Sequence, residues 1–120
     1  MKNVKVRLKK QEVDEGKKFL LSTFNTFDPM SIEDYVHRMN IQSLAMKFYN
    51  KSKATRHHKP NKIISLTVNV NEVISSEYVL NRMPQLDPYN WAIFNDVLVF
   101  VKKMIEHELT IEDNVILQFR

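Results

Sequence analysis

The chain has 120 residues with a formal net charge of +4, and it is 43% hydrophobic and 27% charged, with one glycine, four prolines and no cysteine. These proportions exclude a disordered, a collagen-like and a disulfide-rich protein, and no apolar run is long enough to span a membrane. We predict a single domain over residues 1–120, and an intracellular protein, because no apolar stretch follows the first basic residues.

The first predicted elements are two strands. Aliphatic and basic residues alternate at the beginning of the chain: Val4, Lys5, Val6, Arg7, Leu8 and Lys9. A period of two is typical of a half-buried strand. A second apolar run covers residues 19–24, and Gly16 lies between the two runs, where a tight loop would require positive φ. We therefore predict a β-hairpin; a helix that begins near Glu12 is the competing interpretation.

A helix is predicted after Pro29, with Ser31 as its N-terminal cap. Two apolar stripes follow on opposite sides of this helix; the first is Ile32, Tyr35, Val36 and Met39, and the second is Ile41, Leu44, Ala45 and Phe48. The helix is therefore either buried on two sides or broken near Asn40. A break would produce a helix-turn-helix motif with residues 41–49 in a DNA groove.

The second half of the chain predicts two more strands and two more helices. Residues 63–71 alternate between apolar and uncharged polar side chains, with Leu66, Val68 and Val70 facing inward. We predict a short helix over residues 75–80, a long helix with a wide apolar surface over residues 88–109, and a final strand over residues 114–119. The predicted fold class is α+β, in which a small, mostly antiparallel sheet, built from the N-terminal hairpin and the two later strands, is packed by helices on one face.

Basic residues are concentrated in the first half of the chain. Residues 1–62 contain 14 Lys/Arg and 6 Asp/Glu, a net charge of +8, whereas residues 63–120 contain 4 and 8, a net charge of −4. One basic cluster covers residues 2–18 and the other covers residues 51–62. Such a surface attracts polyanions. The competing interpretation is that the lysines protect an exposed strand from aggregation and that the loop is only solvated.

Few residue patterns point to catalysis. A single glycine excludes phosphate-binding glycine loops, and the histidines do not have the spacing of metal ligands, so we predict no cofactor and no metal site. Adjacent His57 and His58, beside Arg56 and Lys59, are the best candidates for cleavage of a phosphodiester. We expect a protein that is not an enzyme, and a phosphodiesterase is the third functional hypothesis.

The first hypothesis is a binding protein whose basic face contacts nucleic acid or a nucleoprotein complex, with an Asn/Lys/Ile-rich composition that suits a virus or mobile element. The predicted contact residues are Lys5, Arg7, Lys9, Lys51, Lys53, Arg56, His57, His58, Lys59 and Lys62. Four aromatic residues could stack on bases or fill the core: Phe19, Phe24, Phe27 and Tyr49.

The second hypothesis is a protein-binding module, either an inhibitor or a subunit of an assembly such as a homo-oligomer, that uses helix 88–109 and strand 63–71.

Overall fold

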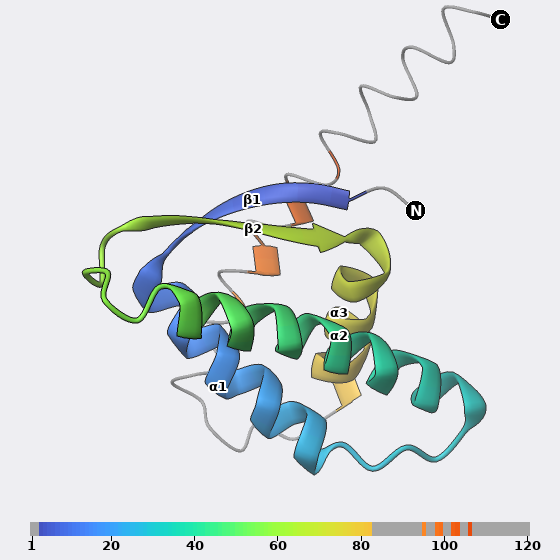
Figure 1. Ribbon diagram of the computed structural model, residues 1–120. Coiled ribbons are helices and arrows are strands. Elements are labelled where there is room, and N and C mark those ends of the chain that lie inside the picture. Colours follow the sequence, from blue (N-terminus) through green and yellow to red (C-terminus); the bar gives the residue numbers. More distant parts are fainter. Residues whose placement is uncertain (1–2, 83–94, 96–97, 100–101, 104–105, 107–120) are drawn as a thin grey trace, which may run out of the picture.

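The computed structural model describes residues 3–82 together with residues 95, 98, 99, 102, 103 and 106. Its elements follow the order β1 (Asn3–Lys9), α1 (Lys10–Thr26), α2 (Ile32–Ala54), β2 (Ile63–Asn69) and α3 (Val70–Arg82) (Figure 1). The predicted α+β class is confirmed, since the described residues form helices that pack against a small antiparallel sheet. The predicted strand 114–119 lies outside the described residues, as does most of helix 88–109. The six described residues of that helix are helical, and Leu98 belongs to the core.

The sheet pairs β1 with β2 in antiparallel register, from Asn3 opposite Asn69 to Lys9 opposite Ile63. The helices lie on one side of this sheet (Figure 1). The side chains alternate as predicted: one set is buried beneath the sheet, and it contains Val6, Leu8, Ile64, Leu66 and Val68. The other set, which includes Lys5, Arg7 and Lys9, is exposed on the outer face. The predicted strand 63–71 is confirmed, except that α3 begins at Val70.

The predicted N-terminal hairpin is wrong. Residues 19–24 belong to α1, and the strand that pairs with β1 comes from much later in the chain. The buried residues of α1 recur at helical spacing, because Val13, Gly16, Leu20 and Thr23 lie on one face. The glycine therefore serves close packing instead of a turn: a Cβ atom on Gly16 would lie 2.5 Å from Cε2 of Phe48 in α2.

Helix α2 is continuous, so the break near Asn40 and the helix-turn-helix motif that depended on it are wrong. The predicted cap is confirmed, since the Ser31 hydroxyl accepts a hydrogen bond from the Asp34 amide at 3.1 Å. The second apolar stripe of this helix is buried in the core. The first stripe is exposed, with 84% of Ile32 and 67% of Met39 accessible to solvent, so the alternative of a helix buried on two sides is wrong as well. We call this surface the α2 stripe, and it consists of Ile32, Tyr35, Val36 and Met39.

A buried carboxylate attaches the beginning of α3 to α2. Glu72 is 1% exposed, and it accepts hydrogen bonds from Lys47 Nζ at 2.7 Å and from Ser43 Oγ at 2.8 Å. Its carboxylate also accepts from the Asn69 amide, and the Asn69 side chain accepts from the Glu72 amide in return. This reciprocal cap ends β2 and starts α3 at a defined point. Among the described helices, none combines the length and the apolarity needed to cross a bilayer.

Candidate functional site

An open hollow of about 580 Å³ lies between the first turns of α1, the last turns of α2 and the loop that follows α2. Five basic side chains line it: Lys10, Lys17, Lys18, Lys53 and Arg56. The rest of the lining consists of Asp14, Tyr49, Ser52, His58 and Pro60. We call this feature the basic hollow. It brings together basic residues from both clusters of the sequence, residues 2–18 and residues 51–62. Along the chain, the rest of α1 and most of α2 separate these two clusters.

Helical periodicity places the residues that α1 contributes. Lys10, Asp14, Lys17 and Lys18 have the spacing i, i+4, i+7 and i+8, so their side chains leave the helix on the same side. The adjacent face of α1 carries the buried residues Val13, Gly16 and Leu20, of which Gly16 packs on Phe48 of α2. Consequently, the packing of α1 determines that its basic side chains project beside the end of α2.

The loop after α2 is held against the beginning of α1 by backbone hydrogen bonds. The amides of Lys10 and Gln11 donate to the carbonyls of Lys62 and Pro60, at 2.8 and 2.9 Å. The first amides of a helix have no partner within the helix, so these two bonds satisfy groups that would otherwise need water. Turns within the loop add two more bonds, including one from the His58 amide to the Thr55 carbonyl. The loop that carries Arg56 and His58 is therefore ordered by its backbone.

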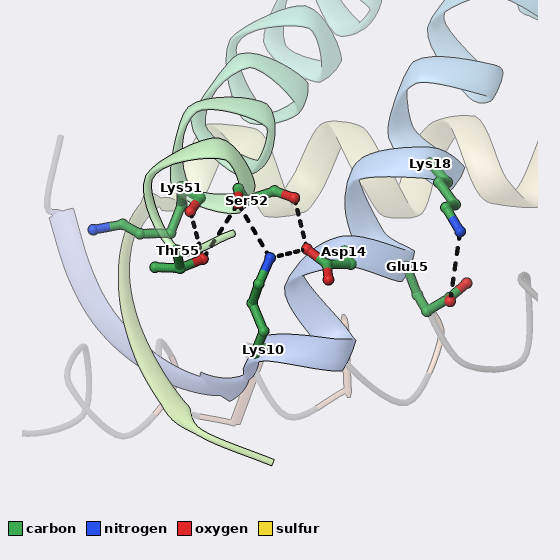
Figure 2. A network of polar contacts seen from close by, with 7 residues as sticks. All are labelled: Lys10, Asp14, Glu15, Lys18, Lys51, Ser52 and Thr55. Carbon is green, nitrogen blue, oxygen red and sulfur yellow. Dashed lines mark hydrogen bonds and ion pairs between the residues drawn. The ribbon is translucent and has the colours of Figure 1, made fainter. Parts of the chain in front are cut away.

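A network of three side chains joins the two helices at the hollow (Figure 2). Lys10 is 5% exposed, and its Nζ donates to Asp14 Oδ1 at 2.5 Å and to the Ser52 carbonyl at 3.1 Å. The Ser52 hydroxyl donates to the same Asp14 oxygen at 2.6 Å. Lys10 and Asp14 thus neutralise each other and connect α1 to α2. Their role is to position the walls of the hollow, and the other basic side chains remain available to a ligand.

The electrostatics of Asp14 agree with this role. Partial burial raises the pKa of the Asp14 carboxyl, but the hydrogen bonds from Lys10 and Ser52 and the nearby charges of Lys10 and Lys17 outweigh that effect. The net result is a pKa below the ordinary value for aspartate. Asp14 is therefore ionised at neutral pH, and it does not act as a general acid there.

The remaining basic side chains keep most of their charge uncompensated. Within the described part of the chain, Lys17, Lys53 and Arg56 form no salt bridge, and Lys18 reaches Glu15 only at 3.9 Å. Lys18, Lys53 and Arg56 are exposed and Lys17 is half-buried. Several positive charges at the rim of one hollow attract an anion more strongly than the same charges spread over a flat surface, because the protein walls reduce solvent screening.

The structure separates the predicted contact residues into several groups. Lys53, Arg56 and His58 line the basic hollow. The basic residues of β1, Lys5, Arg7 and Lys9, are exposed on the outer face of the sheet and do not line it. Lys51 lines a second, smaller depression with Lys47 and Thr67. His57, Lys59 and Lys62 are exposed in the loop outside the hollow.

Three basic residues of the hollow were not among the predicted contacts, namely Lys10, Lys17 and Lys18. They belong to the first basic cluster, but the contacts predicted from that cluster were the alternating residues of the first strand, Lys5, Arg7 and Lys9. The helical spacing of these lysines with Asp14 is the sequence signal that would have grouped them.

A second polar cluster has the residue types of a hydrolase triad. His37 Nδ1 lies 2.9 Å from Ser75 Oγ, and His37 Nε2 lies 3.8 Å from Glu33 Oε1. Ser75 is only 1% exposed, and its oxygen also accepts a hydrogen bond from Asn40. A nucleophile must reach its substrate, so the geometry indicates a structural contact between α2 and α3. Among the described residues, no group of three metal-binding side chains converges.

Comparisons of the chain with protein-family models, with curated proteins and with solved structures found no match. The geometry and charge of the basic hollow are therefore the features from which a function is inferred.

Proposed function

We propose that the protein is a non-catalytic nucleic-acid-binding module and that the basic hollow is its phosphate-binding site. The observation that supports this function is the convergence of basic side chains from α1, α2 and the following loop on one hollow. Lys17, Lys53 and Arg56 carry the phosphate contacts, because each is exposed or partly exposed and none forms a salt bridge among the described residues. Arg56 is suited to a forked contact with two phosphate oxygens.

Two sets of three basic residues allow a matched experiment. The hollow variant is Lys17→Gln/Lys53→Gln/Arg56→Gln, and the control, Lys5→Gln/Arg7→Gln/Lys9→Gln, changes the outer face of the sheet. Both variants lose the same net charge, so a difference between them reports position alone. Fluorescence anisotropy with labelled DNA and RNA, over a series of salt concentrations, measures affinity, and thermal unfolding confirms that both variants are folded.

We expect the parent to bind more weakly as salt increases, because each phosphate contact releases bound counterions. The hollow variant should reduce the slope of log affinity against log salt by about 2 to 3 units. The control should reduce it by less than about 1 unit. No binding of either nucleic acid at low salt would refute the function. An equal loss in both variants would refute the assignment of the site and would indicate a diffuse basic surface.

A protein-binding module is the second candidate function, and the α2 stripe favours it. Four large apolar side chains in a row on one exposed helix face are typical of interaction surfaces. With the purified protein alone, the partner that can be tested is a second copy of this chain. Light scattering should then show an oligomer for the parent and a monomer for Val36→Glu/Met39→Glu. A parent that is monomeric at low and high salt would refute self-association.

The phosphodiesterase hypothesis remains testable, although the hollow offers it little support. Only His58 of the histidine pair lines the hollow, and the carboxylate there is held by Lys10 and Ser52. We expect a labelled oligonucleotide to stay intact with the purified protein and divalent ions. Cleavage that disappears in His57→Ala/His58→Ala would overturn the non-catalytic assignment.

A further inference from the structure

One aromatic residue of the basic hollow is not explained by phosphate binding. Tyr49 lines the hollow and is 41% exposed, whereas the adjacent Phe48 is 2% exposed in the core. Of the aromatic residues that could stack on bases, Phe19, Phe24 and Phe27 pack against the core. Tyr49 is therefore the member of that group whose position in the structure leaves its ring accessible among basic side chains.

The spacing along α2 links this ring to the phosphate-binding residues. Lys53 follows Tyr49 by four residues, so these two side chains lie on the same side of α2, about one helical turn of 5.4 Å apart. Arg56 lines the same hollow from the loop that follows α2. Lys17 and Lys18 line the same hollow from α1. An aromatic surface is thus bordered by positive charge on both sides, the combination by which proteins bind single strands, stacking a base and neutralising its phosphates.

Whether the hollow suits a duplex or a single strand depends on which surfaces each of them presents to a protein. In a duplex the faces of the bases are covered by their neighbours in the stack, so a ring inside a hollow can reach only phosphates and groove edges. In a single strand a base can turn outward and offer its face to an aromatic side chain. The hollow, about 580 Å³ in volume, falls within the size range of sites for small ligands.

We propose that the basic hollow holds one nucleotide of a single-stranded nucleic acid, whose base stacks on Tyr49 and whose flanking phosphates bind Lys17, Lys53 and Arg56. This inference rests on the proposed function and makes it more specific. It predicts a preference for single strands over duplexes, and little dependence on base identity, because every base has a face that can stack.

The test compares Tyr49→Ala with Tyr49→Phe and Tyr49→Trp on three labelled probes: oligo(dT), oligo(rU) and a DNA duplex of the same length. The alanine variant should bind the single strands at least about fivefold more weakly than the parent, whereas the aromatic variants should stay within about twofold. Duplex binding should be weaker than single-strand binding in the parent, and the alanine substitution should not change it. The salt slope should be the same in all four proteins, because stacking neutralises no phosphate.

The outcomes distinguish this inference from the function on which it rests. Salt-dependent binding in which the duplex equals the single strands, or in which Tyr49→Ala matches the parent, overturns the single-strand site and leaves the phosphate-binding function in place. Absence of binding to all three probes at low salt overturns both. Thermal unfolding of Tyr49→Ala shows that a loss of affinity does not come from a loss of structure.

Discussion

Replacing Gly16 by alanine should destabilise the protein, although the same change stabilises most helices. Alanine in a helix interior is favoured over glycine by about 1 kcal/mol. In this structure, however, the new Cβ would lie 2.5 Å from Cε2 and 2.8 Å from Cδ2 of Phe48. Ordinary contacts between carbon atoms begin near 3.5 Å, so either the buried ring or α1 must move by nearly 1 Å.

Overpacking of this kind costs about 1–3 kcal/mol, and the short distances place the cost in the upper part of that range. After subtraction of the gain in helix propensity, we expect Gly16→Ala to lower the free energy of unfolding by about 1–2 kcal/mol. For a domain of this size the midpoint of thermal unfolding should fall by about 4–10 °C. Urea unfolding followed by circular dichroism measures the free energy, and a thermal scan measures the midpoint.

A second background isolates the contact. Phe48→Leu removes the ring atoms that the new methyl group would meet, so Gly16→Ala should have little cost or should stabilise the protein in that background. The double-mutant cycle should therefore give a coupling energy of about 1–3 kcal/mol. If Gly16→Ala were as stable as the parent, or more stable, the close packing of α1 on α2 that forms the walls of the basic hollow would be refuted.

Three further predictions concern the polar contacts and the α2 stripe. The pKa of Asp14 is lowered in the folded protein, so the stability that its carboxylate contributes is complete at neutral pH and is lost as the pH falls below about 4. Urea unfolding at several pH values should therefore show a smaller acid-induced loss of stability for Asp14→Asn than for the parent. Glu72→Ala removes a carboxylate that is 1% exposed and should lower the free energy of unfolding by about 2–4 kcal/mol. The control, Glu77→Ala, breaks an exposed pair and should lower it by less than about 1 kcal/mol. Equal losses in urea unfolding would contradict the difference in burial. Met39→Lys should change stability by no more than about 0.5 kcal/mol, while Ile41→Lys should prevent folding, and a thermal scan that ranks them otherwise would reverse the assignment of the two stripes of α2.

The sequence alone determined those features that depend on local periodicity. Alternation of apolar and polar residues identified β1 and β2, because a strand with one buried face has a period of two. The cap at Ser31 and the helical spacing after it identified α2, and the charge counts identified a basic amino-terminal half. These signals are contained within a few consecutive residues, so no knowledge of the partner elements is needed to recognise them.

Tertiary structure decided what each element packs against. Gly16 is compatible with a turn and with a close helix contact, and only the position of Phe48 distinguishes the two. Both stripes of α2 have the same apolar character, yet α1 and the sheet cover one of them and leave the other exposed. The basic hollow likewise exists only because α1 and the end of α2 meet, which places Lys17 and Lys53 in the lining of one hollow. Burial and proximity are properties of pairs of elements, and a pattern within one segment does not contain them.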